Sequence, residues 1–188
     1  MTRKISGDRC KDDTTLAALT CREARQLTIA TGPPASRSRD DAFVKRLLAA
    51  EGTKVVCGST TADVVARQMG KELQYAPPSS SMNEPPEYHI DGIDLTTEGA
   101  IMLNQVYNIL DEPPESVPES LGEQSPVTRL YNYIRRADVI TFIHGRAMNY
   151  AHSDLVFKQL GVRPRHVTLG LLRDKLRAMG KLVITVQF

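Results

Sequence analysis

The chain has 188 residues, of which 41% are hydrophobic and 24% are charged, and its formal net charge is +2. This is the composition of an ordinary globular protein, and the small, scattered charge leads us to expect neither nucleic acid nor a membrane as a partner. Its three cysteines, Cys10, Cys21 and Cys57, lack zinc-finger spacing, and no run approaches the roughly 20 apolar residues that span a bilayer. We therefore expect a reduced, cytoplasmic protein.

The first strand–helix unit begins after residue 26. The apolar run 27–31 predicts a short buried strand, which Gly32-Pro33-Pro34 ends before a polar loop. Apolar residues at helical spacing over 43–48 then predict a helix, with Asp40 or Asp41 as its N-cap.

A second unit repeats this order. The β-branched run 54–57 predicts a strand, Gly58-Ser59-Thr60 a tight turn, and residues 61–69 a helix that Gly70 closes. A further short strand is predicted over 73–76.

The middle of the chain is richer in loops. Prolines and serines over 77–86 predict an exposed loop. A helix is predicted over 97–110, with Thr96 or Thr97 as its cap and Glu98 favourable in its first turn.

The last third returns to alternating elements. Residues 111–124 predict a loop, and Ser125-Pro126 has the N-cap and N1 signature of a following helix. A strand over 139–143, an amphipathic helix over 167–179 and a strand over 182–186 complete the chain. Strands that alternate with helices predict an α/β fold with an open, mostly parallel sheet flanked by helices.

Ligands of open α/β sheets bind beyond the carboxyl ends of the strands, where helix N-termini offer unpaired amides. The segment Gly58-Ser59-Thr60-Thr61 is small and rich in hydroxyls, so its backbone is suited to approach a phosphate or carboxylate. The alternative is an ordinary capped turn. The segment lacks the lysine of a Walker loop and the further glycines of a dinucleotide fingerprint, so nucleotide binding has little support.

A second candidate segment, His144-Gly145-Arg146, follows another predicted strand. Gly145 allows Arg146 to swing over a site as an anion clamp, whereas a histidine at a strand end is commonly a hydrogen-bonded structural residue. We expect a small anionic ligand between the Gly58 turn and Arg146.

Two carboxylates complete the set of candidates. Asp94 and Glu98, four residues apart across the predicted start of a helix, are suited to hold a cation or to orient Arg146. The simpler alternative is that they act as cap and dipole partners of that helix.

The N-terminal segment carries a family resemblance. Residues 6–19, with the sequence SGDRCKDDTTLAAL, resemble the last motif of metal-dependent PPM-type protein phosphatases, particularly the sporulation stage II protein E (SpoIIE) branch. The resemblance implies that Asp12, with Asp13 beside it, belongs to an Mn²⁺ or Mg²⁺ site, since hard cations take carboxylate oxygens. The alternative is that both aspartates are turn residues before a strand.

The rest of the chain resembles the accessory domain that follows this core in some bacterial proteins. The resemblance rests on TIATGPP at 28–34, KVVCGSTTADVVAR at 54–67, GIDLTTEG at 92–99 and FIHGRAMNYAH at 142–152. It implies that residues 1–22 are the terminal fragment of a phosphatase core and that residues 27–188 form an α/β accessory domain.

We therefore expect a regulatory, ligand-sensing domain of a serine/threonine phosphatase that acts on phosphoproteins, non-catalytic as this chain alone. One alternative is phosphatase activity when the missing core completes the metal site. Another is a free-standing small-molecule enzyme that uses the Gly58 and Arg146 pocket. Residues 14–21 would be a strand without its sheet, which packs on the α/β domain, pairs with a second copy in a homodimer, or is mobile.

Overall fold

The computed structural model describes residues 15–76, 85–113, 125–147 and 161–188. Its strands are β1 (Gln26–Thr31), β2 (Thr53–Cys57), β3 (Gln74–Tyr75), β4 (Glu87–His89), β5 (Leu95–Thr97), β6 (Val139–His144) and β7 (Leu182–Gln187). Its helices are the 3-10 turn η1 (Arg37–Arg39), α2 (Asp40–Leu48), α3 (Ser59–Met69), α4 (Ala100–Ile109), α5 (Pro126–Arg136) and α7 (Arg165–Ala178). Within the described ranges, none of the helices combines the length and the apolarity needed to traverse a lipid bilayer.

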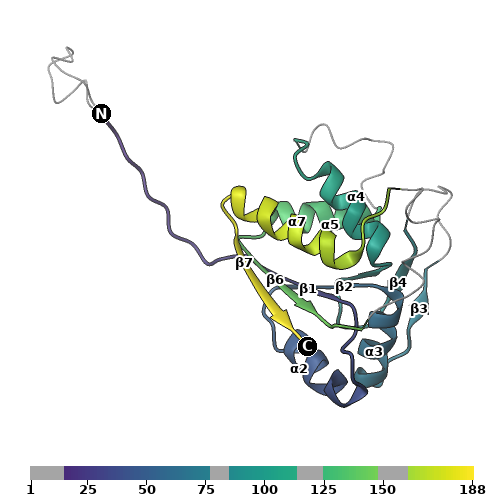
Figure 1. The fold of residues 1–188 in the computed structure, drawn as a ribbon. Helices are drawn as coiled ribbons and strands as arrows, with labels where there is room; N and C mark the ends of the chain where they lie inside the picture. Colours follow the sequence, from purple (N-terminus) through teal and green to yellow (C-terminus); the bar gives the residue numbers. More distant parts are fainter. Residues whose placement is uncertain (1–14, 77–84, 114–124, 148–160) are drawn as a thin grey trace, which may run out of the picture.

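The strands form one seven-stranded sheet in the order β3-β4-β5-β2-β1-β6-β7, with helices on both faces (Figure 1). Strands β5, β2, β1, β6 and β7 are parallel, and β4 and β3 extend the sheet at one edge as antiparallel strands. This confirms the predicted α/β fold with an open, mostly parallel sheet.

The parallel strands have the doubly wound order of dinucleotide-binding folds. From β1 the chain moves outward to β2 and β5, and it then returns to the other side of β1 to form β6 and β7. The direction of winding therefore reverses between β1 and β6. In such sheets a crevice forms beyond the carboxyl ends of the two strands at this reversal.

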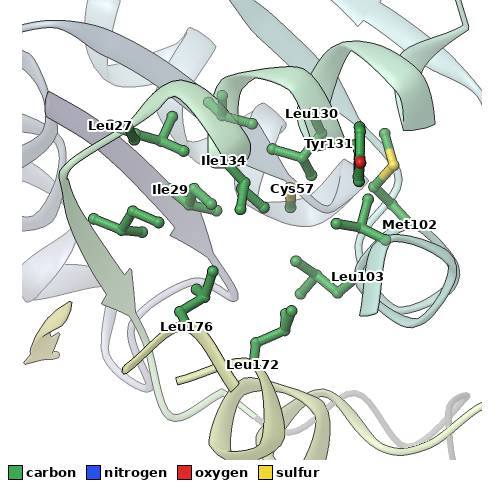
Figure 2. Packing of buried hydrophobic residues seen from close by; sticks show 14 of the residues in the cluster. Leu27, Ile29, Cys57, Met102, Leu103, Leu130, Tyr131, Ile134, Leu172 and Leu176 are labelled. Carbon is green, nitrogen blue, oxygen red and sulfur yellow. The ribbon is translucent and has the colours of Figure 1, made fainter. Parts of the chain in front are cut away.

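Each face of the sheet has its own core. On one face, Leu27 and Ile29 of β1 and Cys57 of β2 pack against α4, α5 and α7, as Figure 2 shows. On the other face, α2 and α3 pack on the sheet around Ala30, Phe43 and further buried residues. Successive residues of β1 therefore belong alternately to the two cores, as the period of a strand requires.

Local signals place several helix ends as predicted. The Ser125 side chain accepts a hydrogen bond from the amide of Thr128 at 3.1 Å, and Pro126 is the first residue of α5. Gly70 ends α3 in the left-handed conformation with φ 62°. Both ends agree with the capping chemistry of the sequence.

The predicted start of the 97–110 helix is wrong. Thr97 is the last residue of β5, which pairs with β2, and α4 begins at Ala100. The Glu98 carboxylate, rather than a threonine hydroxyl, accepts hydrogen bonds from the amides of Ala100 and Ile101, at 3.2 and 2.9 Å. Pairing with β2 outweighs the local capping preference of threonine.

The predicted cap of the 43–48 helix is also corrected. Asp40 is the first residue of α2, and no side chain caps this helix. The Asp40 carboxylate is buried and pairs with Arg67 of α3 at 2.9 Å. The aspartate therefore ties α2 to α3.

The N-terminal segment forms no strand where the structure describes it. Residues 15–25 run away from the domain without regular structure, and the side chains of Leu16 and Leu19 are 93% and 91% exposed (Figure 1). A strand needs backbone partners, and residues 15–21 lead away from the sheet. The segment is attached at its end, where Arg22 pairs with Asp138 at 2.6 Å.

Candidate functional site

The carboxyl ends of the five parallel strands form a continuous row of residues. In register across the sheet, the row is Thr97, Cys57, Thr31, His144 and Gln187. Alternation along each strand places all five side chains on the α4–α5–α7 face, since the residue two positions earlier on each strand points the same way. The row lies at the carboxyl ends of the strands, where the strand order predicts a ligand site.

Hydrogen-bond partners are unevenly distributed along this row. Thr97 Oγ1 donates to the Pro86 carbonyl at 3.0 Å, and Gln187 Oε1 accepts from Arg146 Nη2 at 3.0 Å. The Cys57 thiol is fully buried, and burial, with a smaller effect of Glu98, raises its pKa. Thr31 Oγ1, at the centre, is fully buried and has no hydrogen-bond partner among the described residues.

Three basic side chains gather at the same place. Arg165, the first residue of α7, is partly buried, and its Nη2 donates to the carbonyls of Gly145 and Ala147 at 3.2 and 3.0 Å. Burial, and then the charges of Arg165 and Arg146, lower the pKa of His144. Every ion pair found within the described ranges lies elsewhere, so no carboxylate there pairs with this basic cluster of His144, Arg146 and Arg165.

The loops after β1 and β6 close against each other. The amide of Gly145 donates to the Gly32 carbonyl at 2.9 Å, and the amide of Ala147 to the Pro33 carbonyl at 3.2 Å. A Cβ on Gly145 would overlap the Pro33 carbonyl, and a Cβ on Gly32, where φ is 71°, would overlap the Arg165 guanidinium. Both glycines are therefore required for the close approach.

These loops do not suit a dinucleotide bound in the usual way. A dinucleotide fold cradles pyrophosphate with amides of the loop after its first strand. Here that loop continues as Pro33-Pro34, which have no amide hydrogen, and Arg165 lies over Gly32. The geometry agrees with the absence of a dinucleotide fingerprint from the sequence.

The Gly58 turn lies at this edge as predicted, but it does not face Arg146. Helix α3 begins at Ser59 without a side-chain cap, with Ser59 and Thr60 exposed and Thr61 buried. Strand β1 separates β2 from β6, so the two segments are about 10 Å apart across the sheet. Arg146 turns away, toward Gln187 on β7. The structure therefore does not support one small anion held by both.

The expected partnership of Asp94 and Glu98 is contradicted. Asp94 precedes β5 and Glu98 follows it, so the two residues lie at opposite ends of this strand. Asp94 Oδ2 accepts from the Lys54 amide at 2.8 Å, whereas Glu98 caps α4. The predicted helix start is a strand, and a strand carries residues four apart about 13 Å along the chain.

The predicted metal ligands Asp12 and Asp13 lie outside the described residues, so the expected Mn²⁺ or Mg²⁺ site stays a prediction. In the part of the chain that is described, no three His, Cys, Asp or Glu side chains come together in a group that could hold a metal ion.

Reasoning from the sequence missed the positions of Thr31 and Arg165 at this site. Thr31 reads as an ordinary strand residue, and Arg165 as one of several basic residues near a helix start. Only the fold brings Arg165 onto Gly32 and buries the Thr31 hydroxyl, which has no hydrogen-bond partner in the described part of the chain. The signal that points to them is the Pro33-Pro34 pair, which makes a phosphate loop after β1 implausible and directs attention to other donors.

Comparisons with protein-family models, with curated proteins and with solved structures find no match to this chain. Its class is therefore defined by its own topology, a doubly wound α/β domain with basic side chains near the reversal point of the sheet.

Proposed function

We propose that this chain is a regulatory, ligand-sensing domain that binds a small anion at the carboxyl edge of its sheet. On the motifs of its sequence, we further propose that it accompanies a SpoIIE-like, metal-dependent serine/threonine phosphatase core in the intact protein. The observation that carries the first part is the basic cluster of His144, Arg146 and Arg165, which lies at the reversal point and forms no ion pair with a carboxylate side chain of the described residues.

Physical chemistry favours an anion here. Removing a guanidinium from water costs free energy unless an opposite charge or several acceptors compensate. Arg165 has two carbonyl acceptors for one of its nitrogens, and burial lowers its pKa. A bound anion would supply the missing negative charge and relieve the repulsion that acts on His144.

The residues at the carboxyl ends of the strands are better suited to bind a ligand than to catalyse a reaction. A free-standing enzyme needs a general base or nucleophile beside the ligand. The sequence offers four candidates for this role, His144, His152, Asp94 and Glu98. Glu98 caps α4, Asp94 lies at the opposite end of β5, and His152 lies outside the described residues. His144 remains, and it has no carboxylate among the described residues to orient it.

Strand β6 supports a regulatory role because its two ends touch different parts of the chain. Its carboxyl end carries His144 and Arg146, and just before its amino end Asp138 binds Arg22 and the amide of Arg25. The segment that resembles the end of a phosphatase core is thus attached to the strand that ends in the basic cluster. A ligand-induced shift of β6 would be transmitted through Asp138 to the N-terminal segment and to a phosphatase core joined to it.

The first test is a thermal-shift screen of small anions on the purified chain, followed by titration calorimetry of those that stabilise it. The variant Arg146→Gln is expected to weaken binding about tenfold, the scale of one lost charge-assisted hydrogen bond. Arg173→Gln is the matched control, because it removes the same charge from an exposed arginine that pairs with Asp174. Equal loss in both variants, or no stabilising anion at all, would contradict the proposal.

The phosphatase part is tested by Mn²⁺-dependent hydrolysis of a generic phosphate ester by the chain and by Asp12→Ala. We expect no hydrolysis by either, because a two-metal centre needs carboxylates beyond Asp12 and Asp13. Hydrolysis that Asp12→Ala abolishes would instead establish a catalytic metal centre in this chain. The second arm examines the coding sequence upstream of Met1, where a frame encoding an Asp-Gly metal motif supports the accessory role and a stop codon opposes it.

A further inference from the structure

The buried hydroxyl of Thr31, at the carboxyl end of β1, lacks the hydrogen bond that a buried polar group normally makes among the described residues. It lies at the end of the central strand, it is fully buried, and it has no hydrogen-bond partner among the described residues. An unsatisfied buried hydroxyl costs free energy, so native proteins seldom retain one without a reason. A ligand that accepts its proton is such a reason.

The direction of this hydroxyl follows from the strand. Leu27 and Ile29 belong to the core under α4, α5 and α7, so Thr31, two residues further, points to the same face. Helix α7 begins on this face at Arg165, which lies over the adjacent Gly32. The hydroxyl thus lies on the face of the sheet on which α7 begins, a helix of 14 residues whose start has no side-chain cap among the described residues.

Arg165 supplies the second half of the site. Among the described residues only its Nη2 has acceptors, the carbonyls of Gly145 and Ala147. The N–H groups of its Nε and Nη1 have no acceptor among the described residues, so each can donate a charge-assisted hydrogen bond to an oxygen of a phosphate or carboxylate. The helix start adds a favourable dipole and free amides.

The surrounding loops limit the size of the ligand. The β1 and β6 loops are closed by two backbone hydrogen bonds, and Pro33-Pro34 offer no amides to a second phosphate. One oxyanion group is accommodated here more readily than the pyrophosphate of a dinucleotide.

We propose that Thr31 Oγ1 and the Arg165 guanidinium together hold a single phosphate group, either inorganic phosphate or the terminal group of a phosphate monoester. This rests on the proposed function and names its ligand class. It places the ligand between β1 and α7, on the side of β1 away from the Gly58 turn on β2. A phosphate sensor of this kind would report the product of phosphatase action or a phosphorylated metabolite.

The experiment is titration calorimetry of inorganic phosphate, a simple sugar monophosphate and NAD⁺ at constant ionic strength. The chain is expected to bind phosphate or the monophosphate and not NAD⁺. Thr31→Val keeps the shape of the side chain and removes the hydroxyl, so it should weaken binding at least tenfold while leaving the melting temperature equal or higher. Thr31→Ser should bind as the wild type does.

The matched control is Thr28→Val, on the same strand but on the opposite face, which should leave the affinity unchanged. Should Thr31→Val fail to fold, amide chemical shifts of the wild-type chain serve instead. Phosphate is expected to move the signals of Gly32 and of residues 165–168 more than those of residues 58–61.

The outcomes separate this inference from the proposed function. Unchanged phosphate binding in Thr31→Val, tighter binding of NAD⁺ than of phosphate, or largest shifts at residues 58–61 would overturn the Thr31 and Arg165 site. If phosphate and the monophosphate fail to bind but another anion binds in an Arg146-dependent manner, the inference fails and the sensing function stands. If no anion binds, both fail.

Discussion

Basic side chains lie close enough together at the carboxyl end of β6 to influence one another's charge. His144 is half-buried, and its pKa is lowered first by burial and then by Arg165 and Arg146. The neutral imidazole is therefore favoured in the folded chain. In the unfolded chain the same imidazole has its ordinary pKa of about 6.5.

This difference predicts a pH dependence of stability. As the pH falls below about 6.5, the unfolded chain takes up a proton at His144 before the folded chain does, so this group's contribution destabilises the fold progressively until its folded-state pKa is passed. The free energy of unfolding, measured by urea denaturation at pH 7.5 and 5.5, should fall less for His144→Gln than for the wild type.

The control for this prediction is His89→Gln, which replaces an exposed histidine of β4. It should keep the wild-type pH dependence. A wild-type dependence in His144→Gln as well would show that the basic cluster does not disfavour the imidazolium. Added phosphate should reduce the wild-type pH dependence if it neutralises the cluster.

At the scale of elements, the start of α4 shows how a short strand and a helix share one polar segment. Glu98 stands between β5 and α4 and accepts from two of the free amides of α4. Gly99 follows, and a Cβ there would lie 3.1 Å from Gly58 Cα, so the turns after β2 and β5 pack backbone to backbone. This fixes the beginnings of α3 and α4 beside one another.

Loss of this cap should therefore destabilise the domain. Glu98→Ala leaves two amides of α4 without their side-chain acceptor, at a cost of about 1 kcal/mol in the free energy of unfolding. Urea denaturation of the variant measures it. Glu72→Ala, at an exposed position after α3, removes the same charge and should change stability by less than about 0.5 kcal/mol. Equal effects would assign the loss to net charge rather than to capping.

At the scale of the whole molecule, the α/β domain stands apart from the segment before it. Residues 15–21 are exposed and contribute no strand to the sheet, whereas Arg22 and Arg25 contact Asp138 (Figure 1). The Arg22 guanidinium and the Arg25 amide hold the pKa of the Asp138 carboxyl well below its usual range. The boundary of the folded unit therefore lies close to residue 22.

Two truncations test this boundary. A chain that begins at Arg22 should unfold at the same temperature as the full chain in a circular dichroism melt, because residues 15–21, the described part of the deleted segment, are exposed. A chain that begins at Gln26 loses both contacts to Asp138 and should unfold at a lower temperature. A large loss in the first truncation would show that the N-terminal segment belongs to the folded core.

Much of the fold could be predicted because its elements are long enough to show a period or a cap. Ser125-Pro126 marks the start of α5, Gly70 the end of α3, and the run 139–143 most of β6. Strands β4 and β5 were not predicted, since each has three residues and β5 is followed at once by helix-forming sequence. Because β5 was not predicted, Asp94 and Glu98 were expected to be neighbours on a helix, whereas they lie at opposite ends of β5.

The α/β class, most of the long elements and the placement of Gly58, His144 and Arg146 near strand ends could be predicted from the residues alone, because hydrophobic periodicity and helix capping act over a few residues. Which of these segments are neighbours became known only from the fold. Sheet order puts β1 between Gly58 and Arg146, and the fold brings Arg165 to Gly32, next to the Thr31 hydroxyl that has no partner within the described ranges. Such contacts depend on strand order and helix placement, which are set by the packing of the whole domain rather than by any local run of residues.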